Sequence, residues 1–153
     1  MRTITLKSIF ILIFISLSCS MPKYSNYYSF KDQIWHQDSS IVFNYNNLSN
    51  TNLKFEISIS YSNSYPFQNL YTSYSLLDSE KNIINTKMIE LQLFDKKNGI
   101  PLGSGIYNNF VVDSIFLQTD QLIENEKYQL LVKHSMRENY LNGVIRLGIS
   151  ITD

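Results

Sequence analysis

Three stretches of the chain alternate between apolar and polar residues, and this alternation limits the fold more than any other feature of the sequence. In residues 52–61 the odd positions, from Leu53 to Tyr61, are apolar or aromatic and the even positions are polar. Residues 128–136 and 145–151 follow the same pattern. Successive side chains of a strand point to opposite faces, so a period of two predicts strands with one buried face and one wet face.

Weaker strand patterns lie between and around these stretches, at 41–45, 70–77, 88–94 and 114–118. Clusters of Asn, Asp, Ser, Gly and Pro separate them and indicate turns at 46–50, 63–66, 78–82, 95–99 and 139–143. Residues 120–125 are compatible with one helical turn, and no long helix is indicated. About seven short strands with regular turns predict an all-β fold, a single antiparallel β-sandwich of the jelly-roll kind.

The N-terminus has the features of a secretory signal. Arg2 and Lys7 form a basic start, residues 9–17 form a short apolar run, and Ser18 precedes Cys19, the single cysteine of the chain. A basic segment, a short apolar segment and small residues at the cut are typical of a cleaved signal peptide. The cysteine at the cut resembles that of a bacterial lipoprotein, which predicts cleavage between Ser18 and Cys19 and attachment of palmitate-type acyl chains to Cys19.

Two other interpretations of this segment are weaker. A transmembrane helix needs about 20 apolar residues, and the run here is roughly half as long. A free cysteine is often buried, but residues 16–30 show no periodic pattern that could pack one. Ser16 stands where lipoprotein signals carry an aliphatic residue. The expected organisation is a signal peptide at 1–18, a lipidated tether at 19–29 and a β-sandwich at 30–153, held at a membrane by the lipid.

Composition excludes some partners. Removal of residues 1–18 leaves 135 residues, enough for one hydrophobic core, with a formal net charge of −2. No basic run of the kind that follows a phosphate backbone is present, so nucleic acid is a poor partner. Without a second cysteine, no intramolecular disulfide forms, and the core must stabilise the fold.

No constellation typical of catalysis, a metal or a cofactor is recognisable. His36 and His134 are far apart, and His134 lies on an apolar face, which favours a half-buried histidine with satisfied hydrogen bonds. Gly103-Ser104-Gly105 lacks the third glycine of a dinucleotide loop and is interpreted as a loop whose glycines need positive φ. We therefore expect no enzyme activity, no cofactor and no metal site.

Eight tyrosines crowd the first half of the chain, and two interpretations are open. They are Tyr24, Tyr27, Tyr28, Tyr45, Tyr61, Tyr65, Tyr71 and Tyr74. They are either strand formers with a wet hydroxyl group, or members of one exposed contact surface. The first interpretation is favoured.

The order and spacing of several short segments resemble those of a known family. The segments are Tyr65-Pro66-Phe67-Gln68-Asn69-Leu70, 86–93, Leu102-Gly103-Ser104-Gly105, Met136-Arg137, Leu141-Asn142-Gly143 and Leu147-Gly148, with Trp35 soon after the tether. In these features residues 34–153 are similar to the gliding-motility lipoproteins called GldH. The departures from the family pattern are Arg146 in place of an acid, Asn125-Glu126 in place of a glycine turn, and the lack of Pro-Asp-Gly after Leu77.

The resemblance implies a small outer-membrane lipoprotein facing the periplasm, needed for surface gliding and acting with other envelope proteins of the gliding and secretion machinery. It implies a structural or interaction role without catalytic residues. Structural roles are implied for eleven positions, called the motif residues below: Trp35, Tyr65, Pro66, Asn69, Gly103, Gly105, Met136, Arg137, Leu141, Gly143 and Gly148. The Arg137 guanidinium is expected to bind carbonyl groups of the 138–143 loop.

Two other classes stay open. An envelope-anchored module that binds carbohydrate or peptide is the alternative, and a hydrolase is third. A concave face lined with tyrosines would favour the binding module, and a flat exposed patch would favour the machine component.

Overall fold

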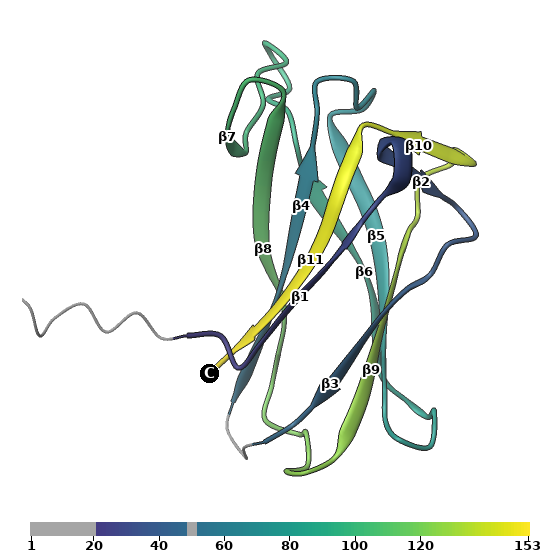
Figure 1. The fold of residues 1–153 in the computed structure, drawn as a ribbon, viewed down its shortest axis with the longest axis vertical. Helices are drawn as coiled ribbons and strands as arrows, with labels where there is room; N and C mark the ends of the chain where they lie inside the picture. Colours follow the sequence, from purple (N-terminus) through teal and green to yellow (C-terminus); the bar gives the residue numbers. More distant parts are fainter. Residues whose placement is uncertain (1–20, 49–51) are drawn as a thin grey trace, which may run out of the picture.

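The structure, a computed structural model, describes residues 21–48 and 52–153. The predictions for residues 1–18 and for lipidation of Cys19 lie outside these ranges. The described residues contain eleven strands and one short 3-10 helix, η2 (Lys31–Gln33). The strands form two facing antiparallel sheets and a two-stranded ribbon (Figure 1).

The sheets are defined by their spatial strand order. Sheet I contains β1 (Tyr24–Ser29), β11 (Val144–Thr152), β4 (Leu53–Tyr61), β8 (Asn109–Thr119) and β7 (Ser104–Ile106). Sheet II contains β3 (Ile41–Asn46), β9 (Lys127–His134), β5 (Asn69–Leu77) and β6 (Ile83–Gln92). The ribbon pairs β2 (Ile34–His36) with β10 (Tyr140–Asn142).

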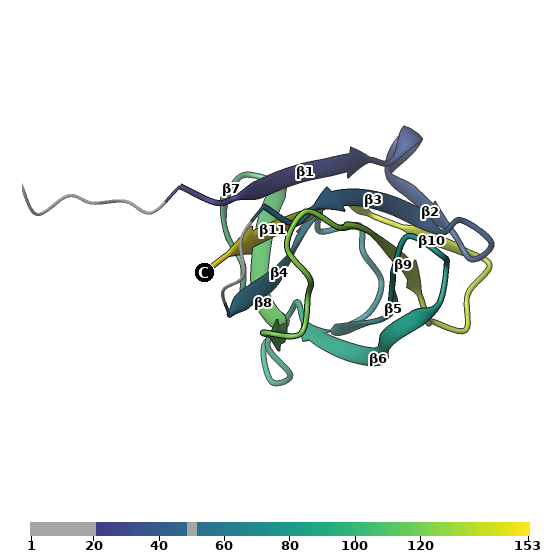
Figure 2. The ribbon, with the colours of Figure 1, turned by 90° about the horizontal axis from the view of Figure 1, so that it is seen from below.

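The connections between the eight longer strands have jelly-roll topology. Counted along the chain without β2, β7 and β10, the first, eighth, third and sixth strands lie side by side in sheet I. The second, seventh, fourth and fifth lie side by side in sheet II. The chain therefore crosses between the sheets after almost every strand, and Figure 2, seen from below, shows the sheets enclosing the interior. The prediction of an antiparallel β-sandwich is confirmed.

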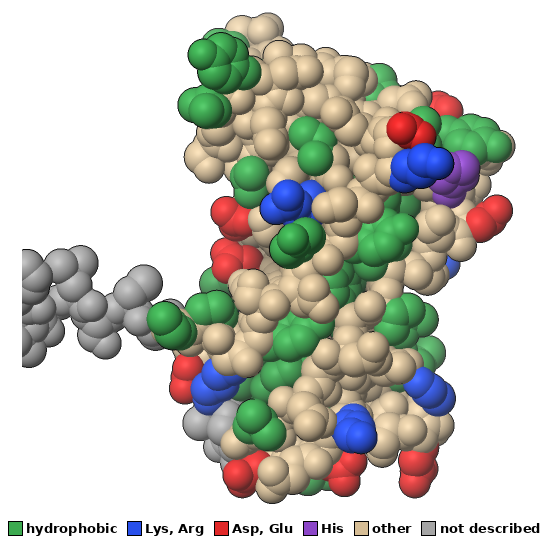
Figure 3. Space-filling view, in the orientation of Figure 1, with side chains coloured by type: hydrophobic (Ala, Val, Ile, Leu, Met, Phe, Trp, Pro, Cys, Tyr) green, Lys and Arg blue, Asp and Glu red, His purple; other side chains and the backbone are tan. Residues whose placement is uncertain are grey.

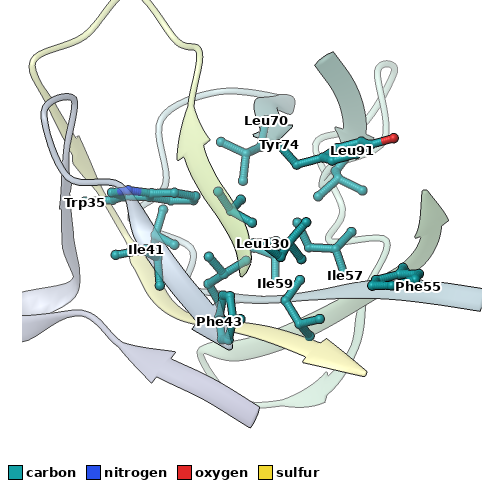
Figure 4. Close-up of a cluster of buried hydrophobic side chains, with 14 of the residues drawn as sticks. Trp35, Ile41, Phe43, Phe55, Ile57, Ile59, Leu70, Tyr74, Leu91 and Leu130 are labelled. Atoms are coloured by element: carbon teal, nitrogen blue, oxygen red, sulfur yellow. The ribbon is translucent and has the colours of Figure 1, made fainter. Parts of the chain in front are cut away.

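The core follows the alternation of the sequence. Every odd residue of β4 is buried, and in β11 the residues Leu147, Ile149 and Ile151 are buried. Ile145, predicted to face the core with them, is only partly buried, because the pairing with β4 is irregular there and Val144 is buried instead. Sheet II contributes the even residues of β9 and β5, including Leu130 and Leu70, which Figure 4 shows between the sheets. Full burial of one such apolar side chain contributes about 1.5–3 kcal/mol, so these strands account for much of the stability.

Some predicted elements differ from those observed. The strand expected at 88–94 begins earlier, at Ile83. The sequence did not predict its first half, because that half is an exposed edge with no apolar period. Residues 120–125 contain a turn and no helical turn. The expected turn at 139–143 includes the short strand β10, which pairs with β2.

The tether is shorter than the sequence suggests. Residues 24–29, assigned above to the tether, form β1 and pair with β11 from Tyr24↔Ile151 to Ser29↔Arg146. All but one of its residues are exposed, so this edge strand has no apolar alternation to reveal it. Backbone pairing holds it in place, and the sandwich begins at Tyr24, not at residue 30.

The long strands run between two ends of the sandwich. The upper end in Figure 1 carries residues 62–68, 93–103, 107–108 and 135–143, and the lower end carries 78–82 and 120–126. Tyr24, the first residue of β1, shares a row of paired residues with Ile151, Phe55 and Leu117 near the lower end. The chain therefore enters the sandwich near the lower end and runs upward.

Candidate functional site

Most of the motif residues meet at the upper end. Ten of the eleven lie on β2, β7 or β10, at the start of β5, or in the connections at this end. Gly148 is the exception, in the middle of β11, where a side chain would press on Ser58. The structure therefore brings together segments that are far apart in the sequence, and the upper end is the candidate site.

Trp35 covers the core beneath the β2–β10 ribbon. Its ring is fully buried, stacks on Phe30 at 4.8 Å between ring centroids, and meets His134 edge-on at 5.4 Å. Its Nε1 donates a hydrogen bond to the Ser39 carbonyl at 3.2 Å. The paired residue on β10, Leu141, is also fully buried. Both motif residues thus act in packing.

Tyr65 and Gly143 hold the loop after β4 against the start of β11. Gly143 has φ = +81°, and a Cβ atom there would overlap the backbone nitrogen of Tyr65. The Tyr65 hydroxyl donates to the Asn69 carbonyl at 2.8 Å. Burial raises the pKa of Tyr65, which keeps this donor protonated. Only glycine combines this φ with such a close approach.

Gly103 and Gly105 serve close contact, not a special backbone conformation. The prediction that they need positive φ is wrong, because among the described glycines only Gly99 and Gly143 have it. A Cβ atom at Gly103 would lie 2.6 Å from the Val111 carbonyl oxygen, and one at Gly105 would overlap the Asn109 carbonyl oxygen. The two glycines therefore let β7 lie tightly on β8.

Tyr61 fixes the segment that leads into this hairpin. Its buried hydroxyl donates to the Leu93 carbonyl at 2.5 Å and accepts from the Gly103 N–H at 3.1 Å. The loop between residues 93 and 103 is thus bound at both of its ends by one phenol, which limits its freedom to move.

Four of the eight early tyrosines behave in this way. Tyr45, Tyr61, Tyr65 and Tyr74 are buried, and each hydroxyl donates to a protein oxygen. The favoured prediction of wet hydroxyl groups is wrong for these four. The aromatic crowding reflects core packing and bonded loops, and does not form one exposed tyrosine face.

Met136 and Arg137 line a groove of about 540 Å³ at the edge of sheet II. Met136 Sδ accepts a hydrogen bond from the Tyr71 N–H at 3.3 Å. The groove also includes Phe67, Tyr71, Met88, Ser135 and Glu138. Arg137 is exposed, and no hydrogen bond or ion pair joins it to another described residue, in contrast to the expected contact with carbonyls of 138–143.

His134 is more buried than expected. Its side chain is 2% exposed, and neither ring nitrogen has a hydrogen-bond partner among the described residues. The hydroxyl of Thr72, its cross-strand partner, is also unpaired there. Burial lowers the pKa of His134, so the neutral imidazole is favoured in the folded protein.

Two further features of the described residues bear on other functions. Within 21–48 and 52–153, no three His, Cys, Asp or Glu side chains are placed to hold a metal ion. No helix in these two ranges has the length and apolar character to cross a membrane. What the described residues define is an all-β jelly-roll domain whose motif residues pack and position loops at one end.

The comparison with protein families identifies the chain more closely. The sequence model of the GldH lipoprotein family matches residues 23–151, and the chain belongs to this family. It is therefore a lipoprotein associated with gliding motility, anchored to a membrane of the cell envelope. Its family is not a known enzyme family. No curated protein matches the sequence.

Several solved structures show weak likeness. One is a family GH115 4-O-methyl-α-glucuronidase with specificity for decorated arabinogalactans, at 14% identity and TM-score 0.43 over 86% of this chain and 16% of that chain. Another is the VP2 subviral particle of infectious bursal disease virus, at 13% identity and TM-score 0.36 over 87% and 33%. A third is dimeric latent PorU from Porphyromonas gingivalis, at 10% identity and TM-score 0.36 over 87% of this chain and 13% of that chain.

The chain spans a third or less of the length of these three proteins. At such low identities and TM-scores, their activities and partners say nothing about this chain.

Proposed function

We propose that the protein is an outer-membrane lipoprotein that faces the periplasm, is anchored through Cys19, and acts as a structural and interaction component of the gliding machinery. The family match over residues 23–151 carries the proposal. Its partners are other envelope proteins of the gliding and secretion machinery, and it works by contact and not by turnover.

The chemistry of the site supports a contact role. The motif residues that belong to the core or to loop contacts, such as Trp35, Tyr65 and Gly143, stabilise a shape. None of them forms a nucleophile–base pair with a neighbour in the described contacts. A domain held at a membrane meets anchored partners at a high effective concentration, so a modest contact affinity is sufficient there.

A gene deletion and a lipid-free variant test this proposal. Deletion should abolish colony spreading, and the wild-type gene should restore it. Cys19→Ser should move the protein into the soluble fraction, because each buried methylene of an acyl chain contributes about 0.8 kcal/mol and stable anchoring needs more than one chain. At normal secreted levels this variant should restore spreading poorly, whereas the neighbouring exposed Met21→Ser should behave like the wild type.

The outcomes separate the two parts of the proposal. Normal spreading of the deletion strain would contradict the role in gliding. A Cys19→Ser protein that stays with the membrane would contradict the anchor, and full restoration by a soluble variant would remove the need for local concentration.

One observation favours the peptide form of the alternative function. The lining of the groove beside Met136 includes Phe67 and Met88 together with Arg137, which has no bonded partner among the described residues, and Glu138. The apolar part of this lining suits an apolar peptide side chain better than a sugar, and Arg137 suits a carboxylate. Calorimetric titration of the purified Cys19→Ser protein with short apolar peptides that end in a free carboxylate tests it. Absence of saturable binding would exclude this candidate.

A further inference from the structure

The tip of the β7–β8 hairpin exposes two large apolar side chains at the upper end. Tyr107 is 95% exposed, more than any other large hydrophobic residue described, and Ile106 beside it is 75% exposed. Figure 3 shows hydrophobic side chains that project at the upper left, over the region of this hairpin. An aromatic ring fully in water contributes nothing to the stability of the fold.

The backbone at the tip is unfavourable for the residue it carries. Ile106 pairs with Asn109, so the turn contains only Tyr107 and Asn108. Tyr107 has φ = +58°, in the left-handed region that Gly and Asn adopt in tight hairpins and that bulky residues avoid. A strained residue with an exposed ring is a reason to look for a function.

The tip is also held firmly. The Asn108 side-chain oxygen accepts a hydrogen bond from the Asn63 N–H at 2.6 Å, which joins the hairpin to the loop after β4. Gly103 and Gly105 keep β7 in close contact with β8. The Tyr107 ring is therefore presented by a fixed backbone, so little conformational freedom is left to lose when it binds a partner.

The segment that leads into the hairpin has an excess of positive charge. Residues 95–112 include Lys96 and Lys97 against one carboxylate, that of Asp95, which accepts hydrogen bonds from the backbone of its own turn. Ile100 and Leu102, in the same segment, are also more than half exposed. The combination suits a surface that offers an apolar pocket with acidic residues at its rim.

We propose that Ile106 and Tyr107 are the docking contact of this lipoprotein for an envelope protein with an apolar pocket and an acidic rim. This inference rests on the function proposed above, because it supplies the surface through which the component would act. Aromatic residues held in place and surrounded by apolar neighbours are the usual centres of binding energy in protein interfaces.

The position of the tip favours a protein over the anchoring membrane. The first residue of β1 shares a row with Leu117, and the tip lies beyond Asn109 on the same strand. Eight residues of a strand span about 26 Å, so the tip is at the opposite end of the sandwich from the point where the chain enters. With the strands upright on the membrane, the tip faces away from it.

Replacement of Tyr107 in the full-length protein tests the proposal. Tyr107→Asn should leave the melting temperature unchanged or raise it, because Asn accepts the left-handed conformation better than Tyr. The same variant should restore spreading of a deletion strain at most one tenth as well as the wild type. This is the result expected if loss of the ring weakens the affinity for the partner about tenfold. Tyr107→Phe keeps the ring and should restore it, as should Ile123→Asn, which removes an exposed apolar residue at the lower end.

Each outcome has a defined meaning. If the deletion strain fails to spread but Tyr107→Asn restores it fully, the docking proposal is wrong and the proposed function stands. If the deletion strain spreads normally, the proposed function itself fails. Sedimentation of purified Cys19→Ser protein with anionic phospholipid vesicles tests a membrane as the occupant, and absence of co-sedimentation would exclude it. Co-sedimentation that Tyr107→Asn abolishes would replace the protein partner by a lipid surface.

Discussion

The two ends of the sandwich are closed by different chemistry. At the upper end, Trp35 fills the space under the ribbon, and Gly143 and Gly105 let backbones approach closely. At the lower end a buried amide is central, because Asn47 Nδ2 donates to the carbonyls of Leu122 and Ile123, each at 3.1 Å. Its Oδ1 also accepts from the Tyr45 hydroxyl at 3.0 Å. Both ends use side-chain hydrogen bonds to backbone groups of their loops, and the upper end adds the volume of Trp35 and the close backbone approach at its glycines.

The difference teaches where each end is vulnerable. The upper end depends on many packing contacts. Its interior should therefore tolerate only small changes in side-chain volume, whereas substitution of its exposed residues should leave the stability of the fold nearly unchanged. The lower end is closed by fewer side chains, chiefly Asn47 and the Tyr128 hydroxyl, which accepts from the Ile123 N–H at 2.8 Å, so loss of Asn47 alone should loosen it. Four substitutions test this contrast, in order of decreasing effect.

Loss of Trp35 should cause the largest effect. Trp35→Ala leaves a cavity beneath the ribbon and should lower the free energy of unfolding by about 3–5 kcal/mol. Urea unfolding followed by circular dichroism measures it. Tyr140→Ala, on the paired strand but 59% exposed, is the control and should cost less than about 1 kcal/mol. Equal costs would show that the ribbon does not cover the core.

At the lower end, Asn47→Ala should cost about 1–3 kcal/mol, because it leaves buried carbonyls and the Tyr45 hydroxyl without their partner. The exposed neighbour Asn46→Ala should be nearly neutral. Hydrogen exchange of the amides in 120–126 should rise in the Asn47 variant alone. If exchange rises equally in the upper loops, the two ends are not independent.

His134 makes the upper end sensitive to pH. Burial lowers its pKa in the folded state below the ordinary value of 6.5, so the unfolded chain binds the proton first. Stability should be full above about pH 6.5 and fall as the pH drops toward the folded-state pKa, by about 1.4 kcal/mol for each unit of difference. His134→Leu should remove this dependence, and Thr72→Val, its cross-strand neighbour, should keep it. The lowered pKa of Asp78, which Asn82 binds, acts only at more acidic pH.

Arg137→Ala should have the smallest effect. The side chain is exposed and has no bonded partner among the described residues, so the free energy of unfolding should change by less than about 0.5 kcal/mol. Arg146→Ala offers a comparison, because that guanidinium lies 4.4 Å from the centroid of the Tyr27 ring and should contribute about 0.5–1 kcal/mol. A larger loss of unfolding free energy for Arg137→Ala would support the contact that the sequence predicted between Arg137 and the 138–143 loop.

The central strands were predictable because each has one buried face. The alternation in β4 and β11 therefore follows directly from the sequence. Strand β1 and the first half of β6 were not predictable, since an edge strand exposed on both faces needs no apolar period and is held by backbone pairing.

The candidate site was predictable only in part. The motif residues could be named from the sequence, but a glycine looks the same whether it serves positive φ, as at Gly143, or close approach, as at Gly105. The role of Tyr107 had no local pattern, because neither the strain of its turn nor its exposure is visible before the hairpin partners are known. The best available indication was Asn108-Asn109 after an apolar residue, a weak hairpin pattern.

The pairing of β1 with β11 has a mechanical consequence. A pull on the N-terminus against a load held at the upper end acts along the strand axis. The six residue pairs from Tyr24↔Ile151 to Ser29↔Arg146 then resist in shear and share the force, instead of parting one after another as in peeling. A strand that adds little to the core thus makes the domain suited to carry tension between a membrane and whatever holds its far end.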